Sequence, residues 1–354
     1  MTHSICNAIL VADLTNGTVE RIPAESLNIS SAEVLCDAFP DSVILFAGIL
    51  SGSYAPAACT ATAKIAGKTF ILKGQSGPGL RRCRVEAMVI KGRSQAPCGA
   101  VVNEKGVFFF PVDSNQTVPE LKLRFYSECA KHAPLFEPAI LLTGTAAFAH
   151  AGMPAISLNV GIAPGSGELA AELSSRGLTG LALAGSTPVA SCVPLDAPIR
   201  QHAKAERVTK ANLKKILQAA SPDTRLGRLP SPGRSIACFA CSSPCGFWIN
   251  PAAGEPVACT SPKALALLSA AGADEKRIAE IFAFASTYGL DPAGLTDLAS
   301  GNMPADLASW NKTASPSMVQ AEGYGHDEIA SRLGICEFYI ARHSGITSEL
   351  ERFI

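Results

Sequence analysis

The sequence lacks any long uninterrupted apolar run. None of its segments approaches the roughly 20 apolar residues that a helix needs to cross a bilayer. The chain also lacks net charge, because 30 Lys and Arg residues balance 30 Asp and Glu residues. Its overall charge therefore attracts it neither to nucleic acid nor to an anionic membrane. No basic segment followed by an apolar stretch opens the sequence, so we expect no signal peptide and a cytoplasmic location.

Charged residues make up 17% of the chain, whereas hydrophobic residues make up 47%. Over 354 residues, this composition indicates a globular protein of two or three domains, each large enough to bury a core. The 12 cysteines are too sparse for a disulfide scaffold, and nothing in the sequence indicates export. We therefore expect reduced thiols, as in the cytoplasm of an anaerobe.

Three of the cysteines lie within one short stretch, residues 238–245, which reads CFACSSPC. Ser and Pro between the thiols do not give the periodicity of a core-facing helix or strand. A turn can instead aim several thiolates at one point, as a metal ion or an iron–sulfur cluster requires. Zinc is the alternative, although it usually takes C-x2-C pairs separated by a longer loop. The stretch therefore predicts a thiolate-bound metal site.

A fourth ligand has to come from elsewhere in the chain. Cys336 is the first candidate, because Gly334 shortly before it permits a close approach of the backbone to a cluster. Cys259 is the second candidate, since it follows soon after the three clustered cysteines. Its surroundings do not resemble a ligand turn.

The first 200 residues favour an α+β fold with much sheet. Asn16-Gly17 is a strong hairpin signal between two apolar segments. The strands are expected at 8–14, 18–22, 43–50, 63–72, 85–91, 100–112 (as a pair), 139–143 and 177–184, with a helix at 118–130. The glycine-rich segment 74–79 lacks the Lys-Ser/Thr of a phosphate-binding loop, so a tight hairpin is expected there.

The character of the chain changes near residue 205. Residues 221–235 are rich in Pro, Ser and Gly and are expected to form a linker or a long loop. The pattern of the remaining sequence is mainly helical. The helices are expected at 206–219, 262–271, 274–288 and 316–333.

Several short blocks, in this order along the chain, resemble the tungsten- or molybdenum-pterin aldehyde ferredoxin oxidoreductases. The blocks are residues 9–20, 44–56, 77–92 and 165–185, the cysteine pattern, the D-x-x-G-L turn at 291–295 and the turn at 334–336. The resemblance implies a β-rich N-terminal domain over residues 1–204 that forms a base for the cofactor. It also implies a reduced, mainly helical domain over residues 205–354 that carries the iron–sulfur ligands.

The same resemblance assigns two sets of site residues. Four cysteines, called here the cysteine quartet, would hold a [4Fe–4S] cluster: Cys238, Cys241, Cys245 and Cys336. Three residues of the D-x-x-G-L turn would contact a pterin: Asp291, Gly294 and Leu295.

Several positions depart from the family pattern where the pterin and the metal should be held. An arginine that bridges the cluster and the pterin is replaced at Cys59-Thr60, and an arginine-rich phosphate-contacting turn is replaced by residues 164–167, PGSG. Lys263 falls on the place of a metal-site glutamate, and Ser331 on that of a pterin-contacting aspartate. Because guanidinium groups are the usual partners of pterin diphosphates, these changes should weaken pterin binding.

The sequence therefore predicts an oxidoreductase-family [4Fe–4S] protein that has lost the tungstopterin site. It would serve as an electron-transfer or accessory subunit, and its partner would be ferredoxin or a larger oxidoreductase subunit. Two alternatives stay open. One is an active enzyme that oxidises an aldehyde to a carboxylic acid with a tungsten or molybdenum pterin, and the other is a structural zinc protein.

Overall fold

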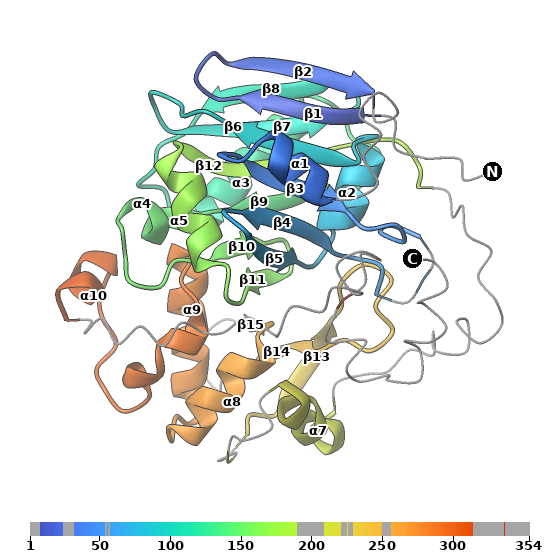
Figure 1. The fold of residues 1–354 in the computed structure, drawn as a ribbon. Helices are drawn as coiled ribbons and strands as arrows, with labels where there is room; N and C mark the ends of the chain where they lie inside the picture. The colour runs from blue at the N-terminus through green and yellow to red at the C-terminus, as the bar shows by residue number, and fades with distance from the viewer. Residues whose placement is uncertain are drawn as a thin grey trace.

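The structure is a computed structural model of the chain. It describes residues 8–23, 32–53, 55, 57–189, 209–220, 225, 229–249, 256–313 and 336. Within these residues, two six-stranded sheets build the first half, and short helices with a three-stranded sheet follow (Figure 1). The fold is thus mixed α+β, with its large sheets first and more helix later. In the described part of the chain, no helix is long and apolar enough to span a membrane.

The first sheet has the strand order β2-β1-β6-β3-β4-β5. Its strands are β1 (Ala8–Asp13), β2 (Thr18–Pro23), β3 (Val43–Ala47), β4 (Ala61–Ile65), β5 (Lys68–Leu72) and β6 (Ala87–Lys91). β1 and β6 are parallel, and the other neighbours are antiparallel. Gly17 adopts φ +64° in the β1–β2 turn, the left-handed conformation that such a tight hairpin requires.

The second sheet has the strand order β11-β10-β9-β12-β7-β8. Its strands are β7 (Cys98–Asn103), β8 (Gly106–Pro111), β9 (Ala139–Leu142), β10 (Ile156–Leu158), β11 (Gly161–Ala163) and β12 (Leu178–Leu183). Only the β12–β7 pair is parallel among these neighbours.

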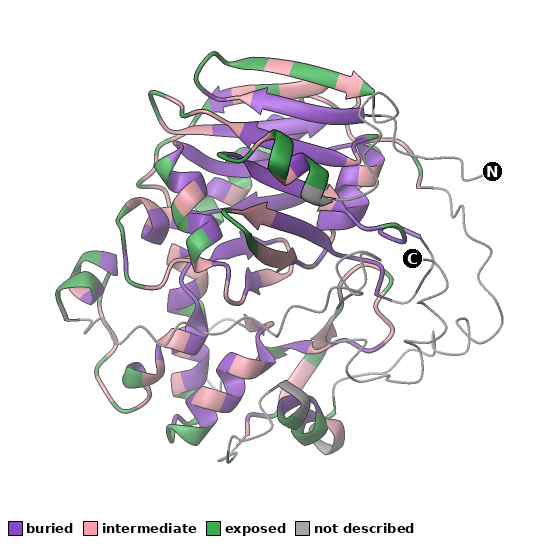
Figure 2. Cartoon of the chain, viewed as in Figure 1, coloured by how far each residue is buried: buried purple, intermediate pink, exposed green. Residues whose placement is uncertain are grey.

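The two sheets share one hydrophobic core. Leu10, Leu45 and Met88 of the first sheet belong to the same buried cluster as Leu141 and Leu181 of the second. Because side chains alternate along a strand, each sheet also has apolar side chains on its outer face, and a helix has to bury them. Helix α1 (Ala32–Ala38) supplies it for the first sheet and α3 (Val118–Ala130) for the second. Figure 2 shows the buried residues concentrated between these layers.

Helix α2 (Ser76–Arg82) contacts strands of both large sheets, β3 and β4 of the first and β9 and β12 of the second. Its glycines allow the helix to approach both sheets closely. A Cβ atom on Gly79 would lie 2.9 Å from Cβ of both Ala139 and Leu183. Two short helices, α4 (Gly144–Phe148) and α5 (Gly167–Ser175), complete this half of the chain.

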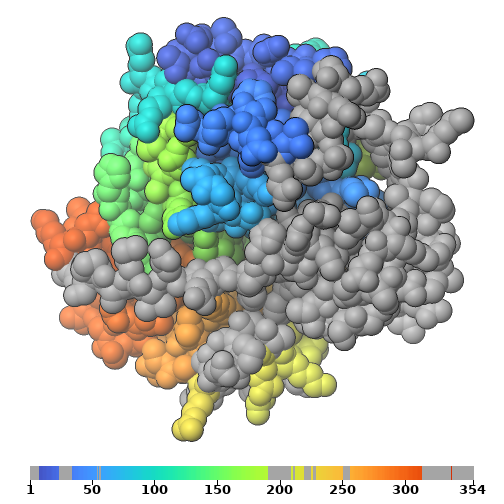
Figure 3. Space-filling model, in the orientation of Figure 1, coloured from blue at the N-terminus to red at the C-terminus, as the bar shows by residue number. Residues whose placement is uncertain are grey.

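The later part of the chain is built from short elements around a second core. They are α7 (Lys210–Ala220), β13 (Pro232–Ile236), β14 (Gly246–Ile249), β15 (Val257–Cys259), α8 (Pro262–Ala270), α9 (Glu275–Tyr288), η2 (Pro292–Gly294), η3 (Thr296–Ala299) and α10 (Leu307–Thr313). Their buried side chains form one cluster with the loop residues Leu50, Ala55 and Cys59 of the first half. In the space-filling view, the first half lies above and α8–α10 lie below it (Figure 3).

The structure corrects three expectations. The strand expected at 63–72 is a hairpin of β4 and β5, because Ala66 and Gly67 both take left-handed backbone angles. The segment 74–79 does not form a hairpin; it leads into α2. The linker expected at 221–235 runs into strand β13. The helix expected at 316–333 lies outside the described residues, and the boundary at 204/205 stays a prediction.

Candidate functional site

The three clustered cysteines lie in the loop between β13 and β14. The N–H of Cys241 donates to the carbonyl of Cys238 (3.1 Å), and Ala240 takes a left-handed φ of +52°. This reversal curls the loop, so that the thiols of Cys238, Cys241 and Cys245 are half-buried against the second core. The cysteine-rich stretch therefore forms a turn, as expected from the Ser and Pro residues between its thiols.

Ala57 ties this loop to Cys336. The N–H of Ala57 donates to the carbonyl of Ala240 (2.8 Å), and its own carbonyl accepts the N–H of Cys336 (3.1 Å). Ala57 also has a left-handed backbone, with φ +55°. One residue of the first half thus joins two segments that are far apart in the sequence, and it brings Cys336, which is 6% exposed, to the cysteine loop.

The thiols of the quartet lie close enough to act on one another electrostatically. Burial raises the pKa of the Cys241 thiol, and the neighbouring Cys238, Cys336 and Cys245 raise it further. A bound cation would offset the repulsion between thiolates at this place, because its charge is opposite to theirs.

A fifth thiol, Cys59, also belongs to this group. It is fully buried, and its S–H donates a hydrogen bond to the sulfur of Cys238. From the sequence, Cys59 was expected only as the replacement of an arginine. That it is itself a thiol was the signal that could have placed it beside the other cysteines. The same hydrogen bond is the main cause that lowers the pKa of Cys238 to about 7, helped by the N–H of Gly74 and the charge of Lys73.

Cys259, the second candidate for the fourth ligand, ends strand β15 and is buried. Burial and the neighbouring Cys245 raise the pKa of its thiol, while the N–H of Ser261 donates to it. Cys259 thus lies beside Cys245 and close to Ser261, the residue that caps α8. The structure therefore places both candidates near the cysteine loop.

Arg82, at the end of α2, also contacts the cysteine loop. Its guanidinium carbon lies 5.5 Å from the ring centre of Phe239 and 4.5 Å from that of Phe136, and its Nη1 donates to Gln75 (3.1 Å). Burial lowers the pKa of Arg82. A guanidinium stacked in this way holds the ring of Phe239, which lies between Cys238 and Cys241 in the sequence.

The chemistry of the thiol donors is compatible with zinc and with an iron–sulfur cluster. Among the described residues, no group of three or more His, Cys, Asp or Glu side chains is placed to hold a metal ion. Zinc would draw four ligands to about 2.0–2.3 Å from one point. A [4Fe–4S] cluster binds each thiolate through a different iron, so it asks for neighbouring thiols around a shared volume.

Asp291 binds backbone groups of the first half. Its carboxylate accepts the N–H of Gly165 (2.9 Å) and the N–H of Ala293 (3.0 Å), and its own N–H donates to Met153 (2.9 Å). The side chain is buried, and burial raises its pKa while the charge of Lys263 lowers it. The described contacts of Asp291 are therefore those of a cap that joins the 291–295 turn to the Gly165 turn.

The other two residues of this turn are enclosed by protein as well. Met153 lies against Gly294 so closely that a Cβ atom there would be 1.7 Å from its sulfur. Leu295 is fully buried in the second core. A pterin contact through Asp291, Gly294 or Leu295 stays a prediction.

The turn at 164–167 has no cation to offer a phosphate. The hydroxyl of Ser166 accepts the N–H of Ile156 (2.8 Å) and donates to the carbonyl of Ala163 (2.6 Å). The N–H of Gly165 is already engaged by Asp291. The polar groups of this turn are thus used within the protein, and the turn offers a diphosphate no guanidinium partner.

Comparisons with known proteins give a likeness in fold alone. No family model matches the chain, and no curated protein matches it. A solved structure, the active-site complex BamBC of benzoyl coenzyme A reductase with 1,5-dienoyl-CoA, is similar, with a TM-score of 0.63 and 16% sequence identity. The match covers 97% of this chain and 61% of that one, so the chain spans less than two thirds of its neighbour's length.

Proposed function

We propose that this chain is an electron-transfer or accessory subunit of a larger oxidoreductase and that the cysteine quartet holds one [4Fe–4S] cluster. The observation that carries the proposal is the double hydrogen bond of Ala57, which joins the 238–245 loop to Cys336. Such a cluster supplies one-electron transfer when it is bound. The chain contributes the thiolates and a largely buried environment.

The proposal of a lost pterin site rests on the residues around Asp291. Its carboxylate is occupied by the N–H groups of Gly165 and Ala293, and the adjacent turn carries no arginine. A diphosphate without guanidinium partners would be bound weakly. For this reason we place no substrate chemistry on this chain itself.

The oxidoreductase setting draws on two likenesses. The sequence blocks resemble aldehyde ferredoxin oxidoreductases, and the fold resembles a chain of a benzoyl coenzyme A reductase complex. A protein that carries a cluster without a reaction centre has to exchange electrons with another protein. We therefore propose a larger oxidoreductase subunit or ferredoxin as its partner.

The test is metal analysis of protein that has been purified without oxygen. We expect about four irons and four acid-labile sulfides per chain, with neither tungsten nor molybdenum. Stoichiometric tungsten or molybdenum would instead support the aldehyde-oxidising enzyme, and zinc alone would support the structural zinc protein. Either of these results would refute the proposal.

A pair of matched variants tests the ligand assignment. Cys241→Ser should abolish the brown colour and the iron content, because the cluster loses one thiolate. Cys129→Ser is the control, since Cys129 is also a buried thiol but lies in α3, within the core of the second sheet. A full cluster in Cys241→Ser, or an equal loss of iron in both variants, would contradict the assignment.

A further inference from the structure

A groove of about 570 Å³ runs along α9, between this helix and the segment 303–305. Its volume lies within the range of small-molecule sites, about 300–1,000 Å³. We propose that this surface, called here the α9 groove, binds a small aromatic carboxylate, with a flat ring at one end and an anionic group at the other. Its principal lining residues are Arg277, Glu280, Phe284, Thr287, Tyr288 and Met303.

The lining residues of α9 lie on one face of the helix. Residues three, four or seven positions apart share a face, and Arg277, Glu280, Phe284 and Tyr288 follow this spacing. Arg277 is in the first turn of α9, whereas Phe284 lies two turns, or about 11 Å, further along the helix. The α9 groove therefore has a charged end and an aromatic end.

The charged end favours an anion. Glu280 is already paired with two cations, because its Oε2 lies 3.1 Å from Nη1 of Arg277 and its Oε1 lies 3.9 Å from Nζ of Lys276. Asp274 caps α9, and its carboxylate accepts the N–H of Arg277 (2.8 Å). A guanidinium has five N–H donors, so Arg277 can hold Glu280 and still donate to a carboxylate in the groove.

The aromatic end is a wall of rings that support one another. The ring centres of Phe284 and Tyr288 lie 5.0 Å apart with an angle of 63° between the planes, and those of Phe284 and Trp310 lie 6.5 Å apart with an angle of 70°. Trp310 is buried in the second core. The Phe284 ring is thus held before a ligand arrives, which lowers the entropic cost of binding a flat ring against it. Met303, from the segment 303–305, adds an adaptable apolar contact.

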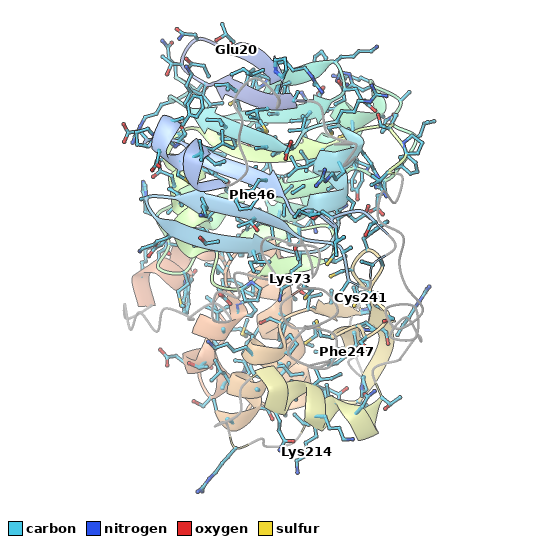
Figure 4. The ribbon with its side chains drawn as sticks, turned by 45° about the vertical axis from the view of Figure 1, so that its right-hand side comes forward. Glu20, Phe46, Lys73, Lys214, Cys241 and Phe247 are labelled. Atoms are coloured by element: carbon cyan, nitrogen blue, oxygen red, sulfur yellow. The ribbon has the colours of Figure 1, made fainter. Side chains whose placement is uncertain are left out.

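The α9 groove is separate from the cysteine quartet. In Figure 4, Cys241 lies to the right of the faint orange helices α8 to α10. The residues that line the groove come from α9 and the segment 303–305, whereas the clustered cysteines lie between β13 and β14. Binding at the α9 groove therefore does not require the proposed cluster.

The experiment measures binding of biphenyl-4-carboxylate to the full-length protein by equilibrium dialysis. Arg277→Gln should raise the Kd about tenfold, because a charge-assisted hydrogen bond is lost. Lys276→Gln is the matched control and should leave the Kd unchanged, since Lys276 pairs with the same Glu280 but lies outside the groove, with its side chain 76% exposed. Tyr288→Leu should raise the Kd about threefold or more, because a ring contact is lost. Tyr126→Leu, in the exposed tyrosine of α3, is its control.

A neutral analogue tests the anionic end of the ligand. Biphenyl-4-carboxamide has the same rings without the charge, and it should bind about tenfold more weakly than the acid. Equal affinity for the acid and the amide would overturn the inference. An equal rise of the Kd in Arg277→Gln and Lys276→Gln would overturn it as well, because the net charge and not the groove would then attract the acid.

The remaining outcomes separate the α9 groove from the proposed function. A folded wild-type chain that binds no biphenyl-4-carboxylate would overturn the inference and leave the cluster assignment standing. A chain that binds the acid as expected but takes up no cluster would refute the proposed function and support the groove. If Tyr288→Leu does not fold, Arg277→Gln and the amide decide.

Discussion

Replacement of Gly77 by alanine tests how tightly α2 supports the loop that carries Cys59. A Cβ atom on Gly77 would lie 2.1 Å from the carbonyl oxygen of Thr60 and 2.7 Å from the hydroxyl of Ser51. That hydroxyl already donates to the same carbonyl (2.7 Å), so neither atom can simply rotate away. The methyl group has to displace backbone at Thr60, next to Cys59.

The size of the effect follows from two opposing contributions. Overpacking of a well-packed site typically costs about 1–3 kcal/mol, and a clash with backbone belongs at the upper end. Alanine in place of glycine inside a helix gains about 1 kcal/mol. We therefore expect Gly77→Ala to lower the free energy of unfolding by about 2 kcal/mol and to reduce iron incorporation, because the loop at 57–60 shifts.

The assay is urea unfolding without oxygen, followed by circular dichroism, together with iron analysis of the folded protein. Gly152→Ala is the matched control, because a Cβ atom on Gly152 would meet no atom within 4 Å. With a slope of about 3 kcal/mol per molar urea, the midpoint of Gly77→Ala should fall by about 0.7 M. A Gly77→Ala protein as stable and as iron-rich as Gly152→Ala would refute the reasoning.

Two further substitutions test single contacts. The N–H and hydroxyl of Thr117 donate to Glu120 and lower the pKa of its carboxyl at the start of α3. The stability that this lowered pKa provides is present above the ordinary pKa of glutamate and is lost as the pH falls through the lowered pKa. Glu120→Gln should therefore be less stable than the wild type near pH 7 and equally stable in acid. A difference in stability that persists in acid would contradict this. Asp291→Ala leaves the N–H groups of Gly165 and Ala293 without their acceptor and should lower the free energy of unfolding by about 2–4 kcal/mol. Unchanged stability in urea would mean that the carboxylate is held for a ligand instead.

Local signals allowed much of the first sheet to be predicted. The hairpin of β1 and β2 was confirmed because Asn16-Gly17 specifies its turn, and helix α3 was confirmed with its bounds at Val118 and Ala130. The β4–β5 turn was missed because it uses Ala66 in a left-handed conformation, for which alanine gives no signal.

Helix α2 was missed for a different physical reason. Two glycines and a proline in seven residues argue against a helix on propensity alone. Packing between the two sheets overrides this preference, because only a helix surface as small as that of Gly77 and Gly79 fits there. A contact of this kind depends on residues far along the chain, which no local pattern contains.

Part of the candidate site could likewise be predicted from local sequence, and part could not. The spacing within residues 238–245 is a local signal, so the clustered thiols could be found in the sequence. The position of Cys59 and the bridging role of Ala57 depend on left-handed alanines and on hydrogen bonds between distant segments. Sequence patterns do not predict such contacts, because alanine has no functional group and gives no signal of a left-handed backbone.

The bridge at Ala57 also has a consequence for how the molecule matures. The cysteine loop and Cys336 meet through the loop at 57–59, because Ala57 is hydrogen-bonded to Ala240 and to Cys336. A cluster that binds this arrangement and not the unfolded chain shifts the folding equilibrium by mass action. If the quartet holds the proposed cluster, iron would stabilise the folded chain, because the cluster would join segments that lie far apart in the sequence.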